Sequence, residues 1–208
     1  VAGSVINYGI ITGLGDDGIV LEGTFGNGLV STGTITGNGH GIIASGAITV
    51  SFTNSGTVDG RDEGILLDGG TLSGDLTNGG SVLADDTGIF LSGGATIIGS
   101  IVNTQTIAAD RDGVDLENGT IGGSLINSGR IAVQTRNAID LVTMSLITGN
   151  IDNSGTIQGV DGIAINNSRL GRIVNKAGAT IRGTDDAISI VNPTARSPST
   201  MRDCSTAT

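Results

Sequence analysis

The sequence predicts an all-β fold, a right-handed parallel β-helix (a β-solenoid) of about eight coils with 22–26 residues each. Three observations predict it. One phrase of about two dozen residues returns along the chain, apolar residues alternate with polar ones inside each copy, and turn-forming residues separate the alternating stretches. A fixed repeat of roughly 20–50 residues is the signature of stacked architectures. The copies are therefore expected to lie on one another as successive coils, with the right-handed connection that parallel strands prefer.

An asparagine in the pattern apolar–x–Asn–x–Gly marks each copy, with a serine in one copy: Asn7, Ser31, Asn54, Asn78, Asn103, Asn127, Asn153 and Asn175. An asparagine amide can bond both the backbone of a turn and its own copies in neighbouring coils. We therefore expect these side chains to form a buried ladder along one corner. The glycine two residues later is expected to supply a positive φ, and Gln105 and Ala177, which replace it, predict two different turns.

Four apolar columns appear when the copies are aligned on this asparagine. In one copy they are Phe52, Val58, Ile65 and Leu67, and in the last copy a small insertion moves the second column to Ile181. Apolar residues two apart indicate a strand, because side chains alternate between its faces. Each copy is therefore expected to form two or three short strands, each paired in parallel with its counterpart in the next coil.

The repeat predicts the domain organisation, with a solenoid domain over residues 1–192 and a non-repeat tail over residues 193–208. The formal net charge of −10 disfavours a nucleic-acid partner, which would attract clustered Lys and Arg. No apolar run approaches the roughly 18 residues of a membrane span. Cys204 is the only cysteine, so no internal disulfide is expected.

The charges are unevenly distributed, which bears on self-association. Residues 1–104 hold ten acidic residues and one basic residue, whereas residues 105–208 hold ten acidic and nine basic residues. Neither end shows an obvious cap, and uncapped solenoid ends expose strand edges. End-to-end self-association therefore stays open. A tail folded over the last coil would block one edge, so we expect a mainly monomeric or weakly oligomeric chain that elongates when residues 193–208 are deleted.

Two short motifs suggest catalysis. GDDG, with Asp16 and Asp17, and GHG, with His40, resemble the acid-pair and histidine motifs of polygalacturonases, which are β-helix hydrolases with paired carboxylates. The same slot of the repeat reads RDEG, DDTG and GVDG in other copies, and the Arg–Ile–Lys motif of that family has no counterpart, because the first lysine is Lys176. We therefore expect no catalytic residue, no enzyme activity and no cofactor.

That slot also predicts an acidic edge along the solenoid: Asp16–Asp17, Asp62–Glu63, Asp85–Asp86, Asp112, Asp161 and Asp185–Asp186. Stacked carboxylates could bind Ca²⁺, which needs six or more oxygen ligands. The nonapeptide of calcium-binding β-rolls is absent from the sequence. The expected role is a solvated turn, with no metal ligand assigned and calcium as the alternative.

The phrase IDNSGTIQGVDGIAI, residues 151–165, resembles the passenger repeats of bacterial autotransporters (type V secreted proteins) and related haemagglutinin-like surface proteins. The resemblance implies secretion across the outer membrane and display at the surface of a Gram-negative bacterium. It implies a non-enzymatic stalk or adhesin segment whose repetitive sides face a ligand on a host or neighbouring cell. The alternatives are a self-assembling extracellular filament subunit and a polysaccharide-acting hydrolase or lyase of the β-helix class.

Overall fold

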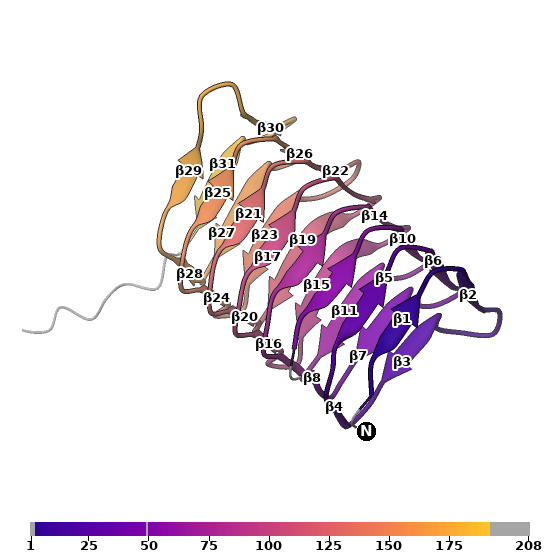
Figure 1. The fold of residues 1–208 in the computed structure, drawn as a ribbon. Coiled ribbons are helices and arrows are strands. Elements are labelled where there is room, and N and C mark those ends of the chain that lie inside the picture. The colour runs from indigo at the N-terminus through magenta and orange to yellow at the C-terminus, as the bar shows by residue number, and fades with distance from the viewer. Residues whose placement is uncertain (1–2, 49, 192–208) are drawn as a thin grey trace, which may run out of the picture.

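The computed structural model describes residues 3–48 and 50–191, which form a β-solenoid of about eight coils. Figure 1 shows the coils following one another along a single axis, from the indigo N-terminal coil to the yellow C-terminal coil. The predicted fold class is confirmed. Among the described residues, no helix is long and apolar enough to cross a membrane. The predicted tail, residues 193–208, lies outside the described residues.

Two eight-stranded parallel sheets meet at the asparagine corner. Sheet A consists of β1 (Val5–Asn7), β5 (Leu29–Ser31), β9 (Phe52–Asn54), β13 (Leu76–Asn78), β17 (Ile101–Asn103), β21 (Leu125–Asn127), β25 (Ile151–Asn153) and β29 (Ile173–Asn175). Sheet B consists of β2 (Ile10–Gly13), β6 (Thr34–Gly37), β10 (Thr57–Gly60), β14 (Ser81–Ala84), β18 (Thr106–Ala109), β22 (Arg130–Val133), β26 (Thr156–Gly159) and β30 (Thr180–Gly183).

Two further parallel sheets complete each coil. Sheet C consists of β3 (Ile19–Leu21), β7 (Ile42–Ala44), β11 (Ile65–Asp68), β15 (Thr87–Ser92), β19 (Asp112–Glu117), β23 (Ile139–Val142), β27 (Ile163–Asn166) and β31 (Ile188–Val191). Sheet D has seven strands, β4 (Thr24–Phe25), β8 (Ala47–Ile48), β12 (Thr71–Leu72), β16 (Thr96–Ile97), β20 (Thr120–Ile121), β24 (Leu146–Ile147) and β28 (Arg169–Leu170).

Sheet D corrects the expectation of two or three strands per coil, because the first seven coils have four. Its inward residues form a fifth apolar column that the alignment missed: Phe25, Ile48, Leu72, Ile97, Ile121, Ile147 and Leu170. Each strand is two residues long and shows no alternation of its own. The turn before it also varies, with two residues between β11 and β12 but three between β15 and β16. A column with variable spacing cannot be seen by fixed-offset alignment.

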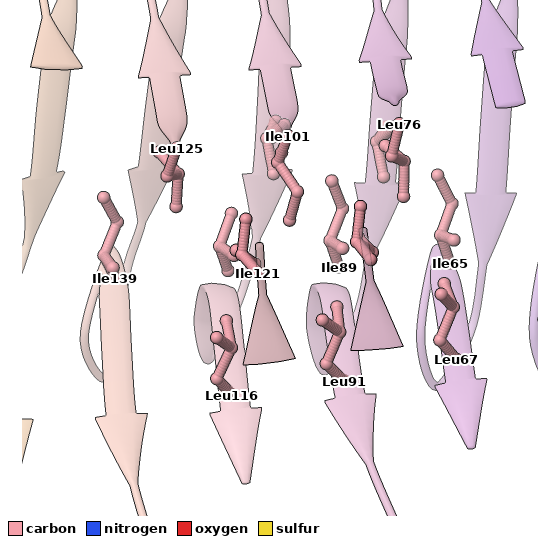
Figure 2. Packing of buried hydrophobic residues seen from close by; sticks show 14 of the residues in the cluster. Ile65, Leu67, Leu76, Ile89, Leu91, Ile101, Leu116, Ile121, Leu125 and Ile139 are labelled. Atoms are coloured by element: carbon pink, nitrogen blue, oxygen red, sulfur yellow. The ribbon is translucent and has the colours of Figure 1, made fainter. Parts of the chain in front are cut away.

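The core consists of like residues stacked from coil to coil, as Figure 2 shows for sheets A, C and D. Ile89 lies between Ile65 and Val114 in the sheet C register and is 0% exposed. Ile181 pairs with Ile157, so the insertion in the last copy restores the column as predicted. Each apolar side chain is covered by its copies above and below, and the small aromatic content of 2% is therefore no obstacle to a dry interior.

The asparagine ladder is confirmed. Asn54, Asn78, Asn103 and Asn127 are 0% exposed. The side-chain amide of Asn78 donates to Asn103 Oδ1 at 2.8 Å, and that of Asn103 donates to Asn127 Oδ1 at 2.8 Å. Each amide also donates to backbone carbonyls, as Asn103 does to Gln105 at 3.0 Å. The ladder therefore satisfies buried polar groups of the turn between sheets A and B.

The glycine after the anchor has a different role from the one predicted. The glycines with positive φ among the described residues are Gly23, Gly28, Gly69, Gly93, Gly94 and Gly178, and none of these follows an anchor by two residues. A Cβ added at Gly56 or Gly129 would instead collide with the backbone carbonyl of Gly33 or Gln105 in the previous coil. The close approach of two backbones at this corner therefore favours glycine there, and its φ does not.

The two exceptions behave differently. Gln105 keeps the standard turn, since its carbonyl accepts the Asn103 amide as Gly56 accepts that of Asn54, so the prediction of a different turn there is wrong. The turn containing Ala177 does differ, as predicted. Asn175 bonds Ala179 four residues on, and Gly178 adopts a φ of +83°. The insertion, rather than the loss of the anchor glycine, changes the turn.

Candidate functional site

The acidic edge exists in the structure as the row of turns between sheets B and C. Its carboxylates accept backbone N–H groups from the next coil. Asp17 Oδ1 accepts from His40 N–H at 2.8 Å, Asp112 Oδ1 from Asn137 N–H at 3.0 Å, and Asp161 Oδ1 from Asp186 N–H at 3.0 Å. A carboxylate that bonds backbone amides holds a turn in place. This geometry gives the row a structural task in joining neighbouring coils.

His40 lies between two carboxylates from adjacent coils. Its Nδ1 is 2.6 Å from Asp17 Oδ1, and its Nε2 is 3.0 Å from Glu63 Oε2. All three side chains are mostly covered, with exposed fractions of 21% for His40, 11% for Asp17 and 13% for Glu63. Asp16 takes part in neither of these two contacts, and its side chain is exposed. The structure thus brings together two of the three motif residues and adds Glu63.

The arrangement leaves His40 without a ring nitrogen for chemistry. A catalytic histidine uses one nitrogen for its orienting partner and the other for the reacting group. Both nitrogens of His40 face protein carboxylates. Burial raises the pKa of Glu63, and the nearby Asp86 and Asp62 raise it further, while His40 acts in the opposite direction. The contacts of His40 with Asp17 and Glu63 therefore connect three successive coils. The 23-residue spacing from Asp17 to His40 and from His40 to Glu63 was the signal for the third member.

Two ion pairs continue the row beyond this group. Arg111 Nη1 lies 2.9 Å from Asp86 Oδ2, and Arg136 Nη1 lies 3.4 Å from Asp112 Oδ2. The Asp112 side chain is 2% exposed, whereas that of Arg136 is 47% exposed. Burial raises the pKa of Asp112 and is opposed by the backbone N–H of Asn137 and by both arginines. The arginines thus compensate the acidic edge where it enters the near-neutral C-terminal half of the chain.

Asp115 and Asp140 form a second acidic group that the sequence analysis missed. They pair in register on β19 and β23. Each stands between two inward residues and therefore faces outward, yet Asp140 is only 6% exposed. The same outward position holds Val20, Ile43, Leu66 and Phe90 in the first four coils. Two carboxylates that follow four large apolar residues in one row were the available signal.

These two carboxyls have strongly altered acidity. Burial raises the pKa of Asp115 to about 8, helped by the negative charges of Asp140, Asp112 and Glu117 and opposed by Arg136. Burial likewise raises the pKa of Asp140, while a hydrogen bond from the Asn137 side chain lowers it. Asp115 Oδ1 is buried without a hydrogen-bond partner. A protonated carboxyl beside a carboxylate is the pair of groups that general acid–base catalysis uses. Such a pair can act on a substrate only where a cleft beside it holds the substrate.

Two cavities of the described part of the chain lie elsewhere. A cavity of about 740 Å³ opens at the C-terminal end, between Ile147, Ile165, Leu170 and Ile188, and one of about 280 Å³ adjoins Met144. Neither is lined by an acidic residue. Within residues 3–48 and 50–191, no three His, Cys, Asp or Glu side chains are placed to hold a metal ion. Calcium binding at the acidic edge therefore gains no geometric support.

The remaining broad feature is the outer surface around the asparagine corner. Hydroxyl side chains dominate the row where sheet B begins, at Thr34, Thr57, Ser81, Thr106, Thr156 and Thr180. β-Branched side chains dominate the outward row of sheet A, at Ile6, Val30, Thr53, Thr77, Val102, Ile126 and Val174. The two rows run the length of the solenoid, at the spacing of about 4.8 Å between strands. Such a surface presents the same chemistry many times to a partner.

Comparison with protein-family models, with curated proteins and with solved structures finds no match to this chain.

Proposed function

We propose that the chain is a non-enzymatic segment of a bacterial cell-surface protein, a stalk or adhesin segment like those of autotransporter passengers. The observation that carries this proposal is the uninterrupted stack of short coils. Between the sheet A and sheet B strands of most coils lie two residues, as at Ser55–Gly56, and between sheets B and C lie only two to five, as at residues 61–64. A stack of this kind supplies length and a repetitive side, which are the properties that a stalk or an adhesin needs.

The candidate catalytic residues support the non-enzymatic part of the proposal. Substrate sites are concave and surrounded by convergent groups, whereas the short turns beside Asp17 and His40 provide no wall. Both ring nitrogens of His40 are held by carboxylates. Hydrolysis of a glycosidic bond needs two carboxyls free to reach the substrate, and Asp17 is instead bonded to the side chain and the backbone of His40.

The first experiment tests the location. An antibody raised against the chain should label intact cells of the source bacterium, and protease added to intact cells should remove the epitope. An internal protein serves as the control for lysis. Antibody signal that appears only after the cells are opened would overturn the surface proposal.

The second experiment tests the activity. The chain should release no reducing ends from polygalacturonate or from other acidic glycans over a long incubation. Asp17→Asn and His40→Asn serve as matched variants. Release by the unaltered chain that disappears in Asp17→Asn would make the hydrolase the better proposal.

A further inference from the structure

The two ends of the solenoid expose the same apolar columns. Ile188 and Ile190 in the last coil are 43% and 56% exposed, whereas their partners Ile163 and Ile165 in the coil before are 0% and 5% exposed. In the first coil the column residues Val5, Ile11 and Ile19 are half-buried, and their partners Leu29, Ile35 and Ile42 are almost fully buried. Within the described residues, no coil covers the outer side of the last coil or of the first one.

The asparagine ladder gives these two ends a direction. In the interior, an Oδ1 accepts two bonds, as Asn78 does from the Asn54 amide at 2.9 Å and from Gly80 N–H at 3.3 Å. At the start of the ladder, Asn7 Oδ1 accepts from Gly9 N–H at 3.0 Å, and no described coil precedes it to supply an amide. At the other end, the Asn175 amide donates to Ala179 at 3.2 Å and has no following asparagine in the described chain. One end offers an acceptor and the other a donor.

We propose that these ends bind each other head to tail, so that the last coil of one copy pairs with the first coil of a second copy. The observed registers extend directly across the junction. Sheet A would place Ile173 over Val5 and Asn175 over Asn7, because β29 and β1 occupy the same slot. Sheet B would place Ile181 over Ile11. Sheet C would place Ile188 over Ile19 and Ile190 over Leu21. Apart from the asparagine pair, these inward contacts would join apolar residues, as they do inside the molecule.

The charges of the two ends are complementary in total. Residues 3–27 carry Asp16, Asp17 and Glu22 and no lysine or arginine, whereas residues 171–191 carry three cations, Arg172, Lys176 and Arg182, with Asp185 and Asp186. The exception is the acidic edge. The Gly18 N–H donates to the His40 carbonyl of the next coil, and the Gly162 N–H donates to the Asp186 carbonyl of the next coil. Asp186 therefore occupies the same place in its coil as Asp17 does in the first coil. Across the junction, Asp186 would lie over Asp17. This contact weakens the junction and supplies a specific test of its register.

A second copy fits this end better than the chain that follows Val191. In the seven coils that contain sheet D, its apolar residue comes four to six residues after the last inward residue of sheet C, as Leu72 follows Leu67 and Ile97 follows Leu91. The corresponding positions after Ile190 are Thr194, Ala195 and Arg196. No large apolar residue is available there, so the sequence does not continue the columns. The first coil of another copy does continue those of sheets A, B and C.

The test uses two variants of the full chain, each altered at one end. Ile11→Lys with Ile19→Lys alters the first coil, and Ile188→Lys with Ile190→Lys alters the last. Circular dichroism should show that both retain the β-sheet signal, because the interior coils are unchanged. Sedimentation velocity should show concentration-dependent elongation of the unaltered chain. Deletion of residues 192–208 should strengthen it, and electron microscopy of that form should show linear rods.

Each altered variant alone should self-associate on the order of 100-fold more weakly than the unaltered chain, which corresponds to about 2.7 kcal/mol. An equimolar mixture of the two should form a dimer and stop there, because it contains one pair of native ends. A heterologous contact of this kind predicts that limit. Asp185→Asn with Asp186→Asn should strengthen association of the unaltered chain, since it removes the carboxylates placed over Asp16 and Asp17.

Three results would overturn the proposal. The first is a monomer for both the intact and the shortened chain at every concentration. The second is self-association of a single altered variant as strong as that of the unaltered chain, which would indicate contact through another surface. The third is a mixture that contains no dimer although the unaltered chain associates.

Discussion

Replacement of Asn103 by alanine tests whether the ladder stabilises the fold. Asn103 is 0% exposed. Its amide donates to Gln105 O at 3.0 Å, Asn127 Oδ1 at 2.8 Å and Arg130 O at 3.2 Å, and its Oδ1 accepts from Asn78 at 2.8 Å. Alanine removes the bond accepted by Oδ1 and the three acceptor contacts that share the two N–H groups of the amide, all inside a dry corner. At about 1 kcal/mol for each bond, Asn103→Ala should lower the free energy of unfolding by ~3–5 kcal/mol.

Asn103→Ser is the matched variant, because the chain itself uses serine once in this column. Ser31 Oγ accepts the Asn7 amide at 3.1 Å and is 3.4 Å from Gly33 O. Serine at position 103 keeps part of the network, so about half of the alanine effect is expected. Urea unfolding followed by circular dichroism measures both variants, and amide hydrogen exchange shows whether the loss is centred on the coils that contain Asn78, Asn103 and Asn127. An alanine variant within ~1 kcal/mol of the unaltered chain would show that the ladder adds little stability.

Three further predictions address the core, the corner glycines and the buried carboxyls. Ile89→Asp places an unpaired charge in a column that is 0% exposed and should cost at least ~4 kcal/mol in urea unfolding; a melting temperature within a degree of the unaltered chain would contradict the stacking register. Gly56→Ala should cost more than ~1 kcal/mol, because its Cβ meets the Gly33 carbonyl, whereas Gly9→Ala has no atom within 4 Å of its Cβ and should be neutral. The pKa of Asp115 is raised to about 8 in the folded chain, so the folded state binds the extra proton and stability should fall as pH rises from about 4 to about 8. Asp115→Asn should remove the part of this fall that Asp115 causes, and it should raise stability at pH 8 by ~2–3 kcal/mol after allowance for screening by water. The exposed Asp185→Asn is the control, and an equal pH dependence in both variants would refute the assignment.

Much of the candidate site could be predicted from the sequence, since the repeat places residues of one slot in one row. Asp17, His40 and Glu63 share a slot, and their contact follows from stacking alone. The chemistry of the contact does not follow, because side-chain rotamers decide which ring nitrogen meets which carboxylate. Asp115 and Asp140 show a different limit. Their positions follow from strand alternation, but their raised pKa depends on burial at an outward-facing row, which no local pattern records.

The sequence by itself determined the parallel stack, the number of coils, the four main columns and the asparagine ladder. Each of these features depends on one residue lying over its copy about two dozen positions on, and a periodic sequence states that relation directly. Only the tertiary structure decided what depends on the approach of two backbones or on variable turns. The glycines two residues after the anchor, at Gly33, Gly56, Gly80, Gly129 and Gly155, face a backbone carbonyl of the previous coil, and sheet D follows a turn whose length changes from coil to coil. The complementarity of the two ends likewise became visible only when the registers of three sheets and the direction of the ladder were known together.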